Sequence, residues 1–506
     1  MRTATILVLF IACALVPQVA SAASVDWQGG STTLNDASQW WIITELDPAT
    51  RTTTGFPVGG LTGDDAIVRN GTTTTLNSTI NCTQFYLAGK GFAGLPATTR
   101  MVVTTGGQLN ATNNIYVGNG DSQTGVVTQS GGLVEMAGGV PCLRIGQGGS
   151  AGTWSTRGEY NISGGSVRVT SDAGAARIYV GYFPGGTGVV NQSGNSLVEV
   201  VEGGARSYID IGWGKTAVAN PAHGTYNLSS GTLRMSKNVT NNVINVGRDG
   251  GYGWLNQTGG LIDTVNMSVG TNSMAAYGFG EGWYTMTGGT ATGNRIDLGR
   301  MAAVQGTSKG HLKVSQSAVM NFTGSLNYPP GDGGVATGST LDLSIGSTAD
   351  FNLVFGDFYG TADLNIQYTG GYKPVSGQSW KILKLQPSGT IMGLVLTGVS
   401  KGYTITKDVT AGAYVLRFAA HNGDANNDGS VNVGDLGILA GNWAGSGKGW
   451  GSGDFNFDGL VNVGDLGILA GAWGWTGAPG DVGAVPEPAS LALLGLGSLA
   501  MLRRRR

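Results

Sequence analysis

A short apolar phrase that ends in glycine recurs along this 506-residue chain and constrains its fold more than any other feature. It reads Ile-Tyr-Val-Gly at 115–118 and returns with substitutions at 143–146, 178–181, 209–212, 244–247, 267–270 and 296–299. A second phrase, which opens and closes with glycine, interleaves with it at 125–132, 158–165, 188–194, 224–231, 253–260 and 282–289. Successive copies are separated by 23 to 36 residues.

Both phrases alternate apolar and polar residues, which is the period of a β-strand, and both end at a glycine that can take a positive φ. A unit with three short strands cannot bury its apolar face alone, whereas stacked units bury a continuous core. We therefore expect an all-β fold, a parallel β-helix (β-solenoid), in which each strand pairs with the same strand of the next coil. The variable spacing fits this fold because insertions fall in the outward turns.

A column of charges accompanies the repeats, three residues after the second phrase. Its members are Asn110, Glu135, Arg168, Glu199, Arg234, Asp263 and Thr292. Strands of neighbouring coils lie about 4.8 Å apart, so alternating charges attract where like charges would repel. We expect an exposed charge ladder that helps to fix the register of the coils.

The composition excludes several other classes of protein. The chain has 90 glycines without a strict three-residue period, which excludes collagen, and 41% hydrophobic residues, which fits poorly with disorder. Only 12% of the residues are charged, and the net charge is −2. Because no basic stripe is present, nucleic acid is not an expected partner.

Residues 1–22 have the features of a cleavable signal peptide. They carry a positive charge at position 2, an apolar run at 6–16 and an Ala-Ser-Ala cleavage site at 20–22. Export removes Cys13 and leaves Cys82 and Cys142, which are too few for a metal framework. We expect both to be small buried residues, with a single disulfide as the alternative.

Two acidic loops near the C-terminal end begin thirty residues apart. Each has Asp or Asn at positions 1, 3 and 5, glycine for a sharp turn at position 6, a carbonyl at position 7 and a carboxylate at position 12. This pattern suits Ca²⁺, which takes six or more oxygen ligands. The expected ligands of two Ca²⁺ ions are Asp424, Asn426, Asp428, Ser430, Asn432 and Asp435, then Asp454, Asn456, Asp458, Leu460, Asn462 and Asp465.

Each loop continues into a helical pattern with one apolar face, formed by Leu436, Leu439 and Trp443 and then by Leu466, Leu469 and Trp473. Residues 421–476 closely resemble a type I dockerin, which implies docking to a cohesin-like protein module, often to gather polysaccharide-degrading enzymes. Val-Gly pairs at 433–434 and 463–464 stand where that family often reads its partner with polar residues. A purely structural calcium clip is therefore the alternative to docking.

The last residues form a second targeting signal. Pro486, Glu487 and Pro488 precede fourteen apolar residues, 489–502, and four arginines. The apolar run is short for a membrane span of about 20 residues, and arginines stay on the cytoplasmic side. The arrangement strongly resembles the PEP-CTERM sorting signal, which implies transient inner-membrane anchoring, processing by an exosortase and release to the cell surface or extracellular matrix. A plain weak C-terminal anchor is the alternative.

These patterns divide the chain into seven segments. We expect a signal peptide (1–22), an N-terminal β cap (24–105), solenoid repeats (106–314), a C-terminal β cap (315–420), the small α-helical calcium module (421–476), a linker (477–485) and a sorting signal with a hydrophobic helix (486–506). Residues 24–420 resemble the autotransporter-associated β-strand repeat proteins of planctomycetes and related bacteria. That resemblance implies a β-helical passenger without a fixed activity.

Parallel β-helices also host polysaccharide lyases and hydrolases, whose sites need clustered acids. Asp210 and Asp297 share one column, but three coil steps place them about 14 Å apart, whereas paired glycosidase carboxylates lie roughly 5–9.5 Å apart. His223, His311 and His421, the only histidines, lie far apart in sequence. We therefore assign no catalytic residue.

The sequence favours an exported, non-catalytic surface or matrix protein in which a β-solenoid scaffold carries a calcium-dependent docking module. One alternative is a polysaccharide-degrading enzyme, an O-glycosyl hydrolase or a lyase, attached through that module. Another is a carbohydrate-binding solenoid, for which Tyr182, Trp213, Trp254 and Trp283 near the turns are the candidate residues. Packing of these rings beneath loops explains them equally well.

Overall fold

The structure is a computed structural model. It describes residues 24–27, 40–43, 51–53, 65–68, 73–89, 98–119, 123–149, 155–201, 204–215, 220–237, 239–273, 277–301, 308–327, 338–399 and 401–477. The predicted signal peptide and sorting helix lie outside these residues. The chain forms two compact units, one of residues 1–345, 351–367 and 383–398 and the other of residues 346–350, 368–382 and 399–506.

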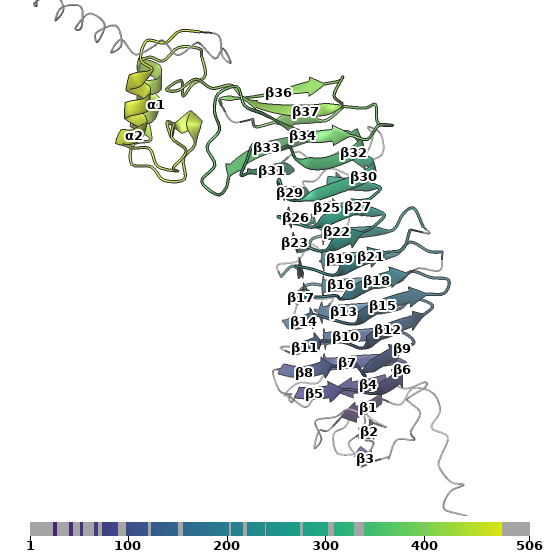
Figure 1. Ribbon diagram of the computed structural model, residues 1–506. Helices are drawn as coiled ribbons and strands as arrows, with labels where there is room; N and C mark the ends of the chain where they lie inside the picture. The colour runs from purple at the N-terminus through teal and green to yellow at the C-terminus, as the bar shows by residue number, and fades with distance from the viewer. Residues whose placement is uncertain are drawn as a thin grey trace, which may run out of the picture. The chain divides into compact units, whose positions relative to one another are not determined.

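The first unit is a parallel β-solenoid, which confirms the predicted fold class (Figure 1). The strand after the second phrase stacks as β6 (Thr79–Cys82), β9 (Gln108–Ala111), β12 (Leu133–Gly138), β15 (Ser166–Ser171), β18 (Leu197–Val201), β21 (Thr232–Met235), β24 (Leu261–Asp263), β27 (Thr290–Gly293), β30 (Val319–Leu326) and β32 (Asn352–Phe358). The Ile-x-Val-Gly strand stacks as β4 (Asp65–Val68), β7 (Gln84–Gly89), β10 (Asn114–Asn119), β13 (Cys142–Gln147), β16 (Arg177–Tyr182), β19 (Tyr208–Trp213), β22 (Val243–Arg248), β25 (Asn266–Asn272) and β28 (Arg295–Met301).

The strand of the second phrase forms a separate sheet of twelve parallel strands. These are β5 (Thr73–Leu76), β8 (Thr98–Val103), β11 (Thr124–Gln129), β14 (Thr156–Ile162), β17 (Gly186–Gln192), β20 (His223–Leu228), β23 (Tyr252–Gln257), β26 (Glu281–Met286), β29 (Lys309–Ser315), β31 (Thr340–Ile345), β33 (Thr361–Tyr368) and β35 (Val395–Thr397). Coil-to-coil pairing thus extends on both sides of the range 106–314.

Antiparallel pairing appears near both ends of the chain. At the start, β1 (Ser24–Trp27) pairs with β2 (Trp40–Ile43), which pairs with β3 (Arg51–Thr53), while β1 also lies parallel to β4. Strand β34 (Ser379–Leu385) precedes a hairpin of β36 (Tyr403–Asp408) and β37 (Ala413–Phe418). Helix α1 (Val433–Gly441), the short 3₁₀ helix η2 (Trp450–Ser452) and helix α2 (Val463–Gly471) follow.

The glycine that ends each Ile-x-Val-Gly phrase is required by a close backbone approach. Gly146 has a φ of +70°, and a Cβ there would lie 1.9 Å from the carbonyl oxygen of Thr187. Gly212 repeats the geometry, with a φ of +75° and a Cβ position 1.9 Å from the oxygen of Tyr252. Only glycine fits such a position, which explains why the phrase always ends in it.

The interior of the solenoid holds buried polar pairs, each of which joins two adjacent coils. Tyr226 donates its hydroxyl hydrogen bond to Gln192 Oε1 of the preceding coil at 2.6 Å, and both side chains are at most 1% exposed. Gln192 Nε2 donates to the carbonyls of Ser196 and Thr232, in its own turn and in the next coil. The same bond recurs between Tyr160 and Gln129 and between Tyr284 and Gln257. Each pair therefore ties two coils together from inside.

The predicted charge ladder is confirmed on the outer face of the β12–β15–β18–β21–β24 stack. Glu135, Arg168, Glu199, Arg234 and Asp263 are consecutive register partners. Arg168 Nε lies 3.2 Å from a Glu199 carboxylate oxygen, and an Arg234 nitrogen lies 3.4 Å from the other. The outer contacts of the ladder, to Glu135 and Asp263, are longer at 4.0 Å.

We expect Tyr226→Phe to destabilise the solenoid by about 1–3 kcal/mol, because Gln192 Oε1 loses its donor in a site that water does not reach. Urea unfolding followed by circular dichroism measures this loss. The matched control is Tyr252→Phe, since Tyr252 is half-buried and its hydroxyl makes no hydrogen bond within the described structure. Equal stability of the two variants would contradict the interior pairing.

We expect Arg168→Glu, which places three acids in a row, to lower the melting temperature at low salt and to recover most of the loss near 1 M salt, where charges are screened. The loss should correspond to less than about 1 kcal/mol per exposed pair. Arg100→Glu is the control, because the register partners Thr73 and Val126 are uncharged. A loss for Arg168→Glu that equals the control, or that salt does not reduce, would refute the ladder's role.

Candidate functional site

The first acidic loop, residues 424–435, winds around the carboxylate at its first position. Asp424 accepts hydrogen bonds from the backbone N–H groups of Asp428 at 3.1 Å and Gly429 at 3.0 Å. Gly429 has a φ of +86°, the left-handed conformation that the sharp turn at position 6 requires. The loop therefore brings positions 1, 5 and 6 together, as the sequence pattern predicts.

Asp435, at position 12, closes the loop from the other end. Its carboxylate accepts hydrogen bonds from the backbone N–H groups of Asn426 at 3.2 Å and Asn432 at 2.9 Å. Asn432 is also the N-cap of α1, where its side chain accepts a bond from Gly434 N–H at 2.7 Å. Asp435 therefore closes the loop and also, by accepting the N–H of the N-cap Asn432, completes the capping box at the start of α1.

The second loop, residues 454–465, repeats these backbone-to-carboxylate bonds and adds one from Phe455 N–H to Asp465 at 2.8 Å. Asp454 accepts bonds from the N–H groups of positions 5 and 6 at 3.2 and 2.9 Å. Asp465 accepts bonds from those of positions 3 and 9 at 3.1 and 2.9 Å, and Asn462 caps α2. Ser430 and Leu460 stand at position 7 of their loops, and each donates its N–H to the aspartate at position 5. A hydrogen-bond chain therefore joins the predicted ligand positions of each loop.

Each loop buries two carboxylates without a cationic side chain. Asp424 and Asp435 in the first loop, and Asp454 and Asp465 in the second, are at most 1% exposed. Among the residues that the structure describes, no Lys, Arg or His nitrogen lies within 4.0 Å of them. Burial raises the pKa of Asp424 and of Asp454, and the other loop carboxylates raise it further. Paired buried negative charges of this kind are stable when a cation lies between them.

The donor set of each loop fits a hard cation. Three aspartates, two asparagines and a backbone carbonyl supply oxygen atoms alone, the chemistry that Ca²⁺ prefers. Within the described ranges no three His, Cys, Asp or Glu side chains converge as a ready-made metal cluster. The loop carboxylates accept hydrogen bonds from backbone N–H groups. The agreement between these loops and a Ca²⁺ site therefore rests on the types of donor atom and on the uncompensated negative charge.

The two halves of the module exchange a short backbone pairing. Val431, at position 8 of the first loop, donates its N–H to the carbonyl of Trp475 at 2.9 Å and accepts a bond from Gly474 at 2.9 Å, beyond α2. Val461, at position 8 of the second loop, makes the equivalent bonds to Ala444 and Gly445, beyond α1. Each loop is thus held by the end of the other helix, which makes the tandem one folding unit.

An aromatic cluster, which sequence reasoning missed, supports the loops. Trp450 is 4% exposed and donates its indole N–H to the carbonyl of Asp424 at 3.1 Å. Its ring lies 5.0 Å from Phe455, 5.4 Å from Phe457 and 5.1 Å from Phe418 of β37. The sequence did contain a sign of this cluster. Trp450 lies in the glycine-rich insert between the two acidic loops, where a large aromatic residue commonly packs against a core.

The predicted apolar faces of the helices need one correction. Leu439 and Leu469 are 1% exposed and form the buried contacts. Trp443 and Trp473, expected on the same faces, are 48% and 52% exposed because α1 and α2 end at Gly441 and Gly471. The i, i+7 spacing runs past the ends of these two-turn helices and does not place the Trp rings in the core.

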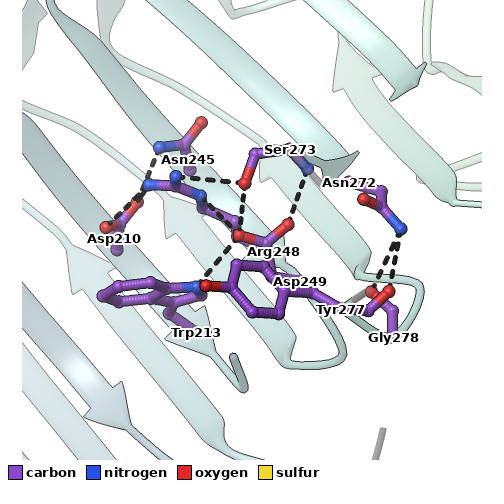
Figure 2. A network of polar contacts seen from close by, with 9 residues as sticks. All are labelled: Asp210, Trp213, Asn245, Arg248, Asp249, Asn272, Ser273, Tyr277 and Gly278. Carbon is purple, nitrogen blue, oxygen red and sulfur yellow. Dashed lines mark hydrogen bonds and ion pairs between the residues drawn. The ribbon is translucent and has the colours of Figure 1, made fainter. Parts of the chain in front are cut away.

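On the solenoid, the acidic column that contains Asp210 and Asp297 lies in the predicted register, with Asn245 and Ser268 between them. Figure 2 shows that Asp210 belongs to a polar network rather than to a pair of acids. Arg248 lies 3.2 Å from Asp210 and 3.0 Å from Asp249, and both aspartates are fully buried.

Asp249 is the centre of this network and joins three coils. It accepts bonds from the indole N–H of Trp213 at 3.0 Å and from the hydroxyl and backbone N–H of Ser273, each at 2.6 Å. In the turn that follows β25, the Asn272 side-chain amide donates hydrogen bonds to the carbonyls of Tyr277 and Gly278 (Figure 2). The network clamps the outward turns, and its carboxylates are fully engaged with their donors.

Three of the candidate aromatic residues stack on neighbours in adjacent coils. Trp254 and Trp283 lie 5.1 Å apart with rings inclined by 5°, and His223 and His311 cover the two ends of this stack. Trp213 stacks on Tyr179 at 5.3 Å. Because a sugar ring binds the flat face of an aromatic ring, these occupied faces do not form a sugar platform.

The remaining sequence expectations concern cysteines. Cys82 and Cys142 are each 2% exposed, so the expectation that both are small buried residues is confirmed. Burial raises the pKa of the Cys142 thiol, although nearby Arg144 and Arg177 act in the opposite direction.

Comparison with known proteins identifies one segment of the chain. Residues 484–506 match the PEP-CTERM protein-sorting motif, which indicates an exported surface protein that an exosortase processes. No curated protein and no solved structure matches the chain. Across the described part of the chain, no helix combines the length and the apolar character needed to cross a membrane.

Proposed function

We propose that this exported β-solenoid protein displays a two-site calcium-binding docking module of the dockerin type, residues 421–476, and that its scaffold is non-catalytic. The observation that carries the proposal is that each loop buries two carboxylates for which the described residues supply no cationic partner, in loops built from oxygen donors. Bound Ca²⁺ would supply the missing positive charge. Asp424, Asn426, Asp428, Asn432 and Asp435, with the Ser430 carbonyl, are the first ligand set, and the equivalent residues of 454–465 are the second.

The outer faces of the helices support a docking role for the module. Val433 and Val463 are each 73% exposed, and glycines 437 and 441 of α1, like 467 and 471 of α2, have no neighbouring atoms where a Cβ would stand. α1 and α2 have the same sequence, so each presents the same uncharged surface. Such a surface suits a cohesin-like partner that contacts the helices through apolar groups and close backbone approach.

We expect Ca²⁺ to raise the melting temperature of the full chain in a chelator-treated sample, with Mg²⁺ raising it less, because Mg²⁺ demands a smaller octahedral site. Asp424→Asn with Asp454→Asn should abolish the shift. Asp408→Asn, on the exposed hairpin, is the control variant and should retain it. Two titrating sites by calorimetry are the expected stoichiometry, and the absence of any calcium effect would refute the metal assignment.

A second measurement, binding to cohesin modules, distinguishes a docking role of the module from a purely structural calcium-binding role. Val433→Asp with Val463→Asp should keep the calcium-induced shift, since neither side chain is a ligand, but should lose binding to cohesin modules in a calcium-containing buffer. If the wild-type chain binds calcium and no cohesin module from a broad panel, the module is a structural clip.

We expect Glu487→Ala in the sorting motif to block processing by the exosortase, because the motif at 484–506 is the recognition signal. The mature C-terminus, identified by mass spectrometry of surface-extracted protein, should then change from a truncated to a full-length form held in the membrane fraction. Glu202→Ala, outside the motif, is the control. Unchanged processing of the Glu487 variant would contradict this role of the tail.

A further inference from the structure

The outer face of β10, β13 and β16 carries arginines packed among aromatic rings. The guanidinium of Arg144 lies 5.1 Å from the ring centre of Tyr116, 5.3 Å from that of Tyr182 and 6.0 Å from that of Tyr179. In the next coil Arg177 is the register partner of Cys142, two residues before Arg144 on the same face. This arrangement fixes two cations on adjacent coils.

Arg144 and Arg177 differ from Arg248 and Arg295, two other half-buried arginines of the solenoid. Arg248 lies within 3.2 Å of two aspartates, and Arg295 lies 3.0 Å from Asp297. Among the described residues no carboxylate oxygen lies within 4.0 Å of Arg144 or Arg177. The hydrogen-bond partner of Arg144 is the neutral side chain of Gln147 at 3.0 Å. Within the described part of the chain, both arginines are therefore cations without a carboxylate counter-charge.

Each of these two arginines also has an unused donor. The Nε atoms of Arg144 and Arg177 are buried and have no hydrogen-bond partner. A partly desolvated guanidinium that lacks an anion is unfavourable, because burial weakens its hydration and nothing replaces it. Asp210 and Asp249, in the following coils, are fully buried and already bound to Arg248. Both side chains are only half-buried, so an external anion would supply the missing counter-charge at their accessible part and not at Nε itself.

The positive character of the face continues along the solenoid axis. Arg206 lies over the ring of Tyr208 at 5.1 Å, Arg177 lies over the same ring at 5.9 Å, and the Lys215 ammonium lies over Phe183 at 5.0 Å. Arg144, Arg177 and Arg206 stand on three successive coils, about 4.8 Å apart along the axis per step, and Lys215 follows β19 in the same coil as Arg206. A linear polymer with regularly spaced anionic groups matches this geometry better than a single small anion does.

We propose that this face binds an acidic polysaccharide, with the Arg144 and Arg177 guanidinium groups holding its carboxylate or sulfate groups. Guanidinium groups bind planar carboxylates through paired hydrogen bonds, which a lysine cannot reproduce. Single-stranded nucleic acid is disfavoured because its bases need free aromatic faces. Here Tyr86 and Tyr116 stack on each other at 4.4 Å, and Tyr182 stacks on Tyr179 at 4.3 Å.

The first test uses the unmodified full chain and polymers that differ in charge alone. Polygalacturonate is compared with its fully methyl-esterified form, and a sulfated galactan with neutral agarose, by calorimetry at low and moderate salt. We expect the acidic members of the pairs to bind, with an affinity that falls as salt rises, and the neutral members not to bind. The two pairs distinguish carboxylate from sulfate recognition. Equal binding of charged and neutral polymers, or no binding of any polymer, overturns the proposal.

The second test assigns the binding to this face. Arg144→Gln with Arg177→Gln should weaken binding of the preferred acidic polymer by about tenfold or more, the loss expected for removal of charge-assisted hydrogen bonds. Arg168→Gln with Arg234→Gln is the matched control, since it removes two exposed arginines from the charge ladder, and it should change affinity less than about twofold. Arg144→Lys keeps the charge and should lose part of the affinity.

Fold and ligand class are controlled separately. Circular dichroism and melting temperature verify that each variant is folded, and if the double Gln variant does not fold, Arg144→Lys and the charge-matched polymers still decide the question. Single-stranded DNA is included as a polyanion of another class. Tighter binding of DNA than of any acidic polysaccharide would contradict the assigned ligand, and equal affinity of the Gln variants and wild type would contradict the assigned face.

Discussion

Parallel backbone hydrogen bonding between coils is the constraint on which the rest of the solenoid depends. Because every strand pairs in register with its counterpart one coil away, each side-chain position becomes a column with neighbours about 4.8 Å apart. A row of asparagines shows the consequence: Asn191, Asn227 and Asn256 each donate an amide hydrogen bond of 2.7–2.9 Å to the preceding member, beginning at Asn161. Residues that tolerate such stacking, or that bond to one another in it, therefore recur at the same position in successive coils.

Two of these columns share a period of two coils, which makes the register specific. The coils with Gln129, Gln192 and Gln257 inside carry an acid outside, while those with Tyr160 and Tyr226 carry an arginine. A slip of one coil would place like charges together and separate each tyrosine from its glutamine. The buried bond contributes more to this specificity than the exposed ion pair, because an unsatisfied buried acceptor costs about 1–3 kcal/mol and a surface pair is worth less than about 1.

The proposed calcium module is held together by other interactions than the coil-to-coil strand pairing of the solenoid. Its loops are shaped by short-range hydrogen bonds from backbone N–H groups to aspartates, and its small core contains Leu439, Leu469 and Trp450. If the module binds calcium as we propose, it would gain much of its stability from the cation. Export supports this dependence, since extracellular modules commonly bind calcium weakly where calcium is plentiful. The proposed polysaccharide face and the proposed docking module would together make the protein a link between a surface polymer and a protein partner.

Local spacing in the sequence was sufficient to predict the parallel solenoid, the order of the charge ladder and the positions of the loop residues. Each depends on residues that are close in sequence or on a period that repeats, such as Glu135, Arg168 and Glu199. The sorting signal is likewise a property of consecutive residues at the end of the chain. Tertiary structure alone decided which side chains find partners across coils. The Tyr226–Gln192 bond, the engagement of Asp210 by Arg248 and the neutral Gln147 partner of Arg144 depend on turns of unequal length and on side-chain directions. A periodic pattern in the sequence does not specify these features.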